Sequence, residues 1–183
     1  MRPTTLCFIV NDQQEILLGR KKRGLGAGKA NGFGGKREDG ETFRQCAVRE
    51  LFEETSLLAK PEDLEPVAIL DFQFPYNEEW THVNYVYLLR NYEGLPMETE
   101  EMEPFWTSFD KIPYDTMWAG DADWIPRVLN GELLKGKLVF GKNNDGIMQM
   151  QITKVTEIPE LESVEATVSY THLRAHETGA YLV

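Results

Sequence analysis

Short runs rich in apolar residues recur along the chain, and in residues 66–74 and 81–90 apolar and polar positions alternate with the period of two that predicts β-strands. The runs come in pairs separated by polar segments, which is typical of hairpins or of neighbouring strands. The paired runs are residues 4–10 and 15–19 across "NDQQ", residues 66–74 and 81–90 across "PYNEEW", and residues 137–142 and 147–155 across "NNDG".

Two further segments have the spacing of helices. Thr42 with Gln45 three residues later forms a capping box, which predicts a helix from Thr42 to about Thr55. Residues 117–133 predict a turn and a C-terminal helix from about Asp121, with Pro126 tolerated only in its early turns. Helices set among mixed strands indicate an α/β sandwich.

Residues 20–40, "RKKRGLGAGKANGFGGKREDG", are rich in glycine and in basic side chains. Glycine allows a backbone to turn sharply and to come close to a ligand. This segment therefore predicts a long loop that can approach a ligand.

The chain has 183 residues, of which 42% are hydrophobic, and this suits a single domain, expected over residues 1–155. A formal net charge of -11 disfavours polymeric DNA or RNA as a partner, so an anionic ligand needs metal ions or a local basic patch. Cys7 and Cys46 lack zinc-ligand spacing, which indicates a reducing compartment. Because no apolar run is long enough for a signal peptide or a bilayer span, we expect a soluble, cytoplasmic protein without membrane partners. We also expect a monomer.

The end of the sequence has a different character. Residues 156–167 are acidic and lack aromatic side chains, which predicts a flexible extension. Residues 168–183, "VSYTHLRAHETGAYLV", resemble a translated sequencing adapter and are expected to be an artefact of sequence assembly. His172 and His176 lie there and are therefore not interpreted as metal ligands.

The predicted first helix carries three carboxylates on one face. Glu50, Glu53 and Glu54 are neighbours at helical spacing. Val48, Leu51 and Phe52 fall on the opposite side and predict a face that docks on a sheet. Hard cations such as Mg²⁺ accept oxygen ligands and also bind phosphate, so the cluster favours a metal site for a polyphosphate substrate. A solvated acidic face is the alternative interpretation.

Spacing beyond the helix supports the metal interpretation. The pattern resembles the signature of the Nudix hydrolase family, except that Ser56 stands where the signature has glycine. A glycine there suits a left-handed helix end, so Ser56 is expected to strain or reshape the turn. The matching positions are Gly35, Glu41, Arg49, Glu50, Leu51, Glu53, Glu54 and Leu57.

The resemblance extends over most of residues 4–155 to the branch of the family that hydrolyses oxidised purine nucleoside triphosphates. The segments that carry it are "LLGRKKRGLGAGKANGFGGK", "EEMEPFW", "KIPYDTMW" and "DADWIPRVL". It implies a Nudix-type α/β/α sandwich with a central mixed β-sheet. It also implies Mg²⁺-dependent cleavage, with Mn²⁺ as an alternative, of triphosphates such as 8-oxo-dGTP to the monophosphate and pyrophosphate.

The resemblance also implies roles for the acidic residues. Arg49 would orient the glutamates by charge-assisted hydrogen bonds. Glu53 is the first candidate for activating water, and Glu101 is the second. Taken without the resemblance, Glu101 reads as part of a solvated acidic loop. The implied metal ligands are the Gly34 carbonyl, Glu50, Glu53, Glu54 and Glu101.

A second set of residues is implied to bind the nucleotide. Lys21 and Lys36 would neutralise phosphates, and the Asn31 amide would bind a base edge, although each also fits an ordinary surface or turn position. The aromatic members would wall or stack on a purine, although such residues are more often core. The full implied set is Lys21, Asn31, Phe33, Gly35, Lys36, Phe72, Phe74, Trp118, Asp121 and Trp124.

Two departures from the branch concern the base. Gly120 replaces the first of two adjacent aspartates, leaving Asp121, and Asp123 is a substitute only if the turn reshapes. Ala30 replaces an aromatic residue. Two other functions therefore stay open: hydrolysis of another nucleoside diphosphate derivative such as a nucleotide sugar, and nucleotide binding without turnover.

Overall fold

The computed structural model describes residues 2–144 and 146–159, which form one mixed sheet of eight strands with two α-helices. Short 3₁₀ turns connect several elements, among them η2 (Glu78–Trp80). The strands are β1 (Arg2–Val10), β2 (Glu15–Lys21), β3 (Ala30–Asn31), β4 (Leu64–Gln73), β5 (His82–Leu89), β6 (Met102–Ser108), β7 (Leu133–Phe140) and β8 (Ile147–Val155). The helices are α1 (Phe43–Thr55) and α2 (Asp121–Leu129).

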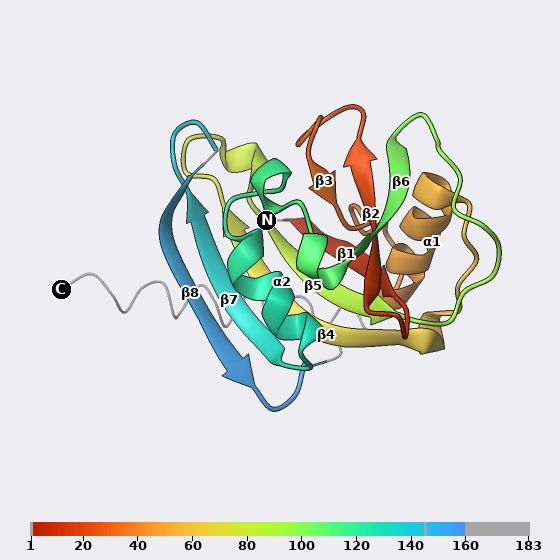
Figure 1. Cartoon of the computed structure of the whole chain (residues 1–183). Coiled ribbons are helices and arrows are strands. Elements are labelled where there is room, and N and C mark those ends of the chain that lie inside the picture. The colour runs from red at the N-terminus through yellow and green to blue at the C-terminus, as the bar shows by residue number, and fades with distance from the viewer. Residues whose placement is uncertain (1, 145, 160–183) are drawn as a thin grey trace.

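The strand order is β3-β2-β1-β5-β4-β7-β8, and β6 pairs with β2 (Figure 1). Two pairs are parallel, β1 with β5 and β4 with β7, and the other pairs are antiparallel. The three strand pairs expected from the paired runs are all present as antiparallel neighbours. The mixed sheet confirms the expected fold class.

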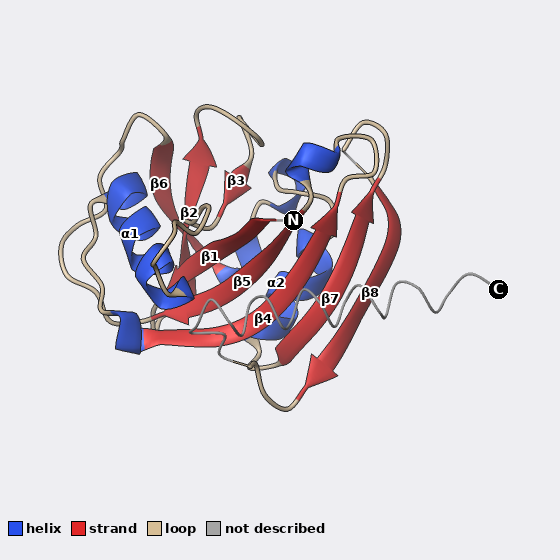
Figure 2. Cartoon of the chain, turned by 180° about the vertical axis from the view of Figure 1, so that it is seen from behind, coloured by secondary structure: helices blue, strands red, loops and turns tan. Residues whose placement is uncertain are grey.

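The helices lie on opposite faces of the sheet (Figures 1 and 2). Successive side chains of a strand point to opposite faces, so β1 contributes to two cores. Leu6, Phe8 and Val10 pack in the cluster that contains Trp124 of α2, whereas Cys7 and Ile9 pack in the cluster that contains Leu51 of α1. This arrangement is the expected α/β/α sandwich.

Helix α1 begins where the sequence predicts. The Thr42 side chain accepts from the Gln45 backbone N–H, and the Gln45 side chain accepts from the Thr42 N–H, so both halves of the capping box form. Such a cap stabilises a helix by about 1 kcal/mol. One expectation was wrong: Phe52 is 49% exposed, and the face that docks on the sheet is made by Phe43, Ala47 and Leu51.

The end of α1 has the left-handed conformation that a glycine would favour. Ser56 has φ 64° and ψ 11°, and its N–H donates to the Phe52 carbonyl. A residue with a Cβ in this conformation costs about 1 kcal/mol relative to its usual regions. The turn is therefore kept, with local strain at Ser56.

Strand β6 was not predicted from the alternating pattern. Pro104 lies inside it and an acidic run precedes it, both of which argue against a strand in a sequence. It forms because it lies beside β2, pairing from Glu15 with Ser108 to Lys21 with Met102. This pairing brings Glu101 next to the glycine-rich loop, where the Lys22 N–H donates to its carbonyl.

Strand β8 ends at Val155, the expected end of the domain, and Ile158 packs against the core cluster on the α1 face. Most of the expected extension and the adapter-like segment lie outside the described residues. Among the residues that are described, no helix is long and apolar enough to span a membrane.

Candidate functional site

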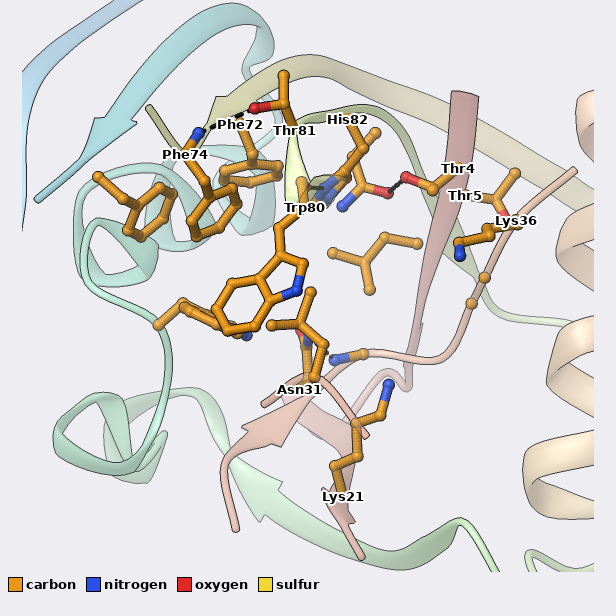
Figure 3. Close-up of a pocket in the computed structure, with 18 of the residues that line it drawn as sticks. Thr4, Thr5, Lys21, Asn31, Lys36, Phe72, Phe74, Trp80, Thr81 and His82 are labelled. Atoms are coloured by element: carbon orange, nitrogen blue, oxygen red, sulfur yellow. Dashed lines mark hydrogen bonds between the residues drawn. The ribbon is translucent and has the colours of Figure 1, made fainter. Parts of the chain in front are cut away.

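A cavity of about 840 Å³ opens between β1, β5, the end of β4 and the glycine-rich loop (Figure 3). Its walls include both basic and aromatic side chains. Residues of the implied nucleotide-binding set that line it are Lys21, Asn31, Gly35, Lys36, Phe72, Phe74, Trp118 and Asp121. Gly34, which was implied as a metal ligand, also lines it.

One end of the cavity is aromatic. The rings of Phe74 and Phe140 stack with centroids 4.4 Å apart and an interplanar angle of 5°. Trp118 meets both edge-on, with centroid distances of 5.8 Å and 5.7 Å. Edge-to-face and offset contacts are the favourable arrangements for aromatic rings. This end can therefore hold a flat, apolar group such as a base.

Trp118 is held from the side of the glycine-rich loop. The Lys29 ammonium lies 5.2 Å from the ring centroid of Trp118 and donates to the Met117 carbonyl at 3.4 Å. A Cβ added at Gly26 would lie 3.1 Å from the Trp118 ring, and Gly26 has φ 82°. Gly26 therefore serves both a left-handed turn and close packing against the indole.

Asp121 is a buried acid at the first residue of α2. Its Oδ1 accepts from Trp124 Nε1 at 3.0 Å, and its Oδ2 accepts from the Trp118 N–H at 3.1 Å. Burial raises the pKa of Asp121 to about 7, although these two hydrogen bonds oppose the rise. A carboxyl with this pKa can present either a donor or an acceptor to a ligand near neutral pH.

Two aromatic residues of the implied set do not reach the cavity. Trp124 is 1% exposed and packs in the core, where it touches the ring of Phe8 and positions Asp121. Phe33 is fully buried in the other core cluster, on the α1 face. Their burial follows from tertiary packing, and both support the site from behind rather than lining it.

The turn before α2 disfavours an aspartate at position 120. Gly120 has φ 92°, and a Cβ there would lie 2.5 Å from Leu138 Cδ2. The proposed substitute, Asp123, is exposed on α2 and does not line the cavity. Asp121 is therefore the carboxyl that α2 presents to the cavity.

Asn31 lies in β3 and faces the cavity (Figure 3). Its Oδ1 accepts from the Gly32 N–H at 2.9 Å, which fixes the side chain on the turn that follows. The two interpretations of Asn31, a turn residue and a base-binding residue, are thus compatible. The Nδ2 amide carries the donors that a ligand could use.

Gly34 and Gly35 form a thin wall between the cavity and α1. The Gly34 N–H donates to Glu54 Oε2 at 2.9 Å. A Cβ at Gly35 would lie 2.5 Å from the Glu50 carboxylate, and a Cβ at Gly34 would lie on the Thr5 carbonyl. Only glycine fits at position 34, and a side chain at position 35 would displace the Glu50 carboxylate, so the cavity backbone and the helix carboxylates approach each other directly.

Arg49 ties the acidic residues together. Its Nε donates to Glu41 Oε1 at 2.6 Å, and its Nη1 donates to Glu50 Oε1 at 2.9 Å and to Glu53 Oε2 at 3.3 Å. These bonds raise the pKa of Arg49 and lower the pKa of Glu41. The arginine orients Glu41 and Glu50, while the Glu53 side chain is 56% exposed.

Burial makes the ionised forms of Glu50 and Glu54 unfavourable. Burial raises the pKa of Glu54 to about 8, opposed by the Gly34 hydrogen bond, and burial also raises the pKa of Glu50. Negative charge on Glu101 adds to both shifts, while Glu53 adds to the shift of Glu50 and Glu50 adds to the shift of Glu54. A divalent cation beside these carboxylates would relieve this cost, so the donor set and the glycine cradle fit such an ion.

The carboxylates do not converge on one point. Among residues 2–144 and 146–159, no three His, Cys, Asp or Glu side chains form a group that could hold a metal. Glu53 turns toward Arg49, and Glu101 pairs with Arg23 Nη2 at 2.5 Å. A cation would have to draw these two side chains away from their arginine partners.

A NUDIX domain match covers residues 1–128, and the chain belongs to the NUDIX domain family. The chain is 40% identical over 154 residues to the oxidized purine nucleoside triphosphate hydrolase of Danio rerio, covering 84% of this chain and 96% of the relative. It is 37% identical over 147 residues to the protein of that name from Mus musculus, covering 80% of this chain and 92% of the relative. These matches confirm the resemblance to the Nudix hydrolases.

The fold has solved counterparts. The mutator MutT protein from Bacillus halodurans superimposes with a TM-score of 0.72, over 83% of this chain and 97% of that chain. Its sequence identity is 23%, so the likeness supports the fold.

Several cavity residues were not predicted. The largest group comes from the turn between β4 and β5 and the start of β5, and consists of Glu78, Glu79, Trp80, Thr81, His82 and Asn84. Side chains alternate between the two faces along β5, so His82 and Asn84 lie on the α2 face with Val86 and Leu88. The sequence pattern could therefore have indicated these two residues. The position of Trp80 depends on how the turn folds back and has no such signal.

Proposed function

We propose that the protein hydrolyses oxidised purine nucleoside triphosphates, such as 8-oxo-dGTP, to the monophosphate and pyrophosphate. The observation that carries the proposal is the Gly34–Gly35 wall, which joins an aromatic, polar cavity to the acidic face of α1. The names of the two relatives from Danio rerio and Mus musculus support the same substrate class.

In this proposal the aromatic end of the cavity binds the base. Phe72, Phe74 and Trp118 provide apolar walls, and Asn31 and Asp121 provide polar groups for the base edges. Because the pKa of Asp121 is raised to about 7, its protonated form can donate to a base oxygen. Polar groups that a wrong base leaves unpaired would penalise its binding.

The other end binds the phosphates. Lys21 and Lys36 line the cavity, and both side chains reach toward it (Figure 3). Glu50, Glu54, Glu53, Glu101 and the Gly34 carbonyl would hold Mg²⁺, or Mn²⁺ as an alternative. Such an ion, when bound, offsets phosphate charge and lowers the pKa of a water molecule.

The reaction adds one water to the triphosphate chain. A carboxylate takes a proton from the water, and the water oxygen bonds to phosphorus. The P–O bond that joins the two products breaks, and its electron pair stays on the leaving oxygen. Glu53 is the first candidate for the proton acceptor, because it is the most exposed carboxylate of the α1 face, and Glu101 is the second. Arg49 is a positioning residue for Glu50 and Glu53.

Nucleotide binding without turnover is the second candidate. The side chains of Glu53 and Glu101 turn to arginines, so the acidic residues are not gathered for a metal. For either function we infer a small-molecule nucleotide partner, a monomer and a cytoplasmic location.

The deciding experiment incubates 8-oxo-dGTP with the protein and Mg²⁺ and identifies the products by chromatography. We expect equal amounts of monophosphate and pyrophosphate, with no products when EDTA is present. Stoichiometric binding without products would favour the second candidate. Release of inorganic phosphate with the diphosphate would contradict the proposed cleavage.

A further inference from the structure

Trp80 is an aromatic cavity residue outside the implied nucleotide-binding set. It ends η2, the turn between β4 and β5, and its side chain is half-buried. Figure 3 shows its indole projecting into the cavity between the phenylalanines Phe72 and Phe74 and the side chain of Asn31. A large apolar ring in this place remains partly exposed unless a ligand covers it.

The backbone around Trp80 is held by a series of hydrogen bonds. The Trp80 N–H donates to the Asn77 carbonyl at 2.9 Å, and the Asn77 N–H donates to the Phe74 carbonyl at 2.9 Å. Thr81 Oγ1 accepts from the Phe74 N–H at 3.1 Å, and the Trp80 carbonyl lies 2.6 Å from His82 Nδ1. The turn therefore fixes the backbone position from which the Trp80 side chain projects.

Both tryptophan side chains are half-buried, but the Trp80 indole has fewer aromatic contacts than that of Trp118. The Trp80 ring meets the Phe74 ring edge-on, with centroids 5.9 Å apart and an angle of 79°. Trp118 by contrast contacts two phenylalanine rings and lies against Gly26 and Lys29. Trp80 has ring area left for a ligand.

Charge indicates which part of a nucleotide would meet Trp80. Glu78 and Glu79, on the same turn, are exposed and line the cavity. Lys21 and Lys36 line the cavity on the side of the glycine-rich loop. Phosphates are repelled by the first pair and attracted by the second, so a bound nucleotide would place its base at the Trp80 end.

We propose that Trp80 stacks on the base of the bound nucleotide and contributes to a preference for purines. A flat π-face binds any base, and the larger purine covers more of the indole than a pyrimidine does. The inference rests on the proposed function in taking a nucleotide as the ligand. It does not depend on turnover or on oxidation of the base.

The test compares Trp80→Ala, Trp80→Phe and the control Tyr76→Ala, because Tyr76 is exposed on the same segment and does not line the cavity. Calorimetric titration without metal gives the dissociation constants of dGMP and dCMP. We expect Trp80→Ala to weaken dGMP binding about tenfold and dCMP binding less. Trp80→Phe should stay within about threefold of the wild type, and Tyr76→Ala should not change.

Unchanged dGMP binding in Trp80→Ala, or equal losses for dGMP and dCMP, would overturn the inference. Chemical denaturation of each variant establishes that it is folded. If the alanine variant is not, Trp80→Leu, which keeps apolar volume without a π-face, takes its place with the same expected losses. Hydrolysis of 8-oxo-dGTP by the wild type separates the two proposals. A protein that fails that assay but loses dGMP binding in Trp80→Ala retains the stacking role without the proposed reaction.

Discussion

The backbone N–H of Gly34 donates to Glu54 Oε2 at 2.9 Å, and this bond joins the cavity wall to a carboxylate of the acidic helix. Gly34 lines the cavity, whereas Glu54 is 3% exposed. A buried carboxylate gains from a backbone donor, because the bond partly replaces lost hydration. The cavity wall and the acidic face of α1 are thus adjacent through main-chain atoms.

Substitution of the α1 carboxylates should remove turnover. Glu53→Gln and Glu54→Gln each remove charge at nearly constant volume, so kcat with Mg²⁺ and 8-oxo-dGTP should fall by at least about a hundredfold. The matched control is Glu62→Gln, an exposed position outside the cavity, which should keep wild-type kcat. Near-normal rates in both helix variants would refute the proposed metal site.

The metal-free protein should lose stability as pH rises. The pKa of Glu54 is raised from 4.5 to about 8, so the folded state resists an ionisation that the unfolded state undergoes freely. Between pH 4.5 and about 8 the unfolded state binds fewer protons than the folded state, so the free energy of unfolding falls as the pH rises. Glu54→Gln should flatten this fall, leaving the smaller part due to Asp121, whose pKa is about 7.

Urea denaturation in EDTA at several pH values between 4.5 and 8 measures the effect. Glu62→Gln should retain the wild-type slope. Addition of Mg²⁺ at pH 7 should release protons, because metal ligands must be deprotonated. Identical slopes for the wild type and Glu54→Gln would show that Glu54 is not buried as described.

Restoration of the aspartate pair should destabilise this protein. Gly120 has φ 92° and its Cβ position lies 2.5 Å from Leu138 Cδ2, so Gly120→Asp combines backbone strain with a steric clash. We expect a loss of about 2 kcal/mol in the free energy of unfolding. Ala122→Asp, on the exposed face of the same helix turn, is the control and should change it by less than about 0.5 kcal/mol. Wild-type stability of Gly120→Asp would mean that the turn can reshape.

Ser56→Gly should stabilise the protein. A glycine relieves the left-handed strain at φ 64°, and we expect a gain of about 0.5–1 kcal/mol in the free energy of unfolding. Ser56→Ala keeps the Cβ and should give no gain. If both variants have the same free energy of unfolding in urea denaturation, strain at Ser56 does not reduce the stability of the protein.

Local features of the sequence predicted much of the fold. The capping box of Thr42 and Gln45 fixes the start of α1, and the apolar runs on either side of short polar segments locate three strand pairs, because each signal depends on neighbouring residues alone. Strand β6 was not predicted because its pairing with β2 is a long-range contact, and because Pro104 within it argues against a strand.

The site was less predictable for the same reason. Phe33 and Trp124 stand beside cavity residues in the sequence, yet both side chains point into the core, since burial depends on partners from distant elements. The pairing of Glu101 with Arg23 and the position of Trp80 also arise only in the folded chain. The glutamate spacing on α1, by contrast, could be read directly.

The ratio of kcat/KM for 8-oxo-dGTP to kcat/KM for dGTP tests the central claim most directly. We predict a ratio of at least about ten for the wild type, because Asn31 and Asp121 offer polar groups that the normal base leaves unpaired. The ratio should fall severalfold in Asn31→Ala and remain unchanged in the exposed control Asn143→Ala. A wild-type ratio near one would contradict the account.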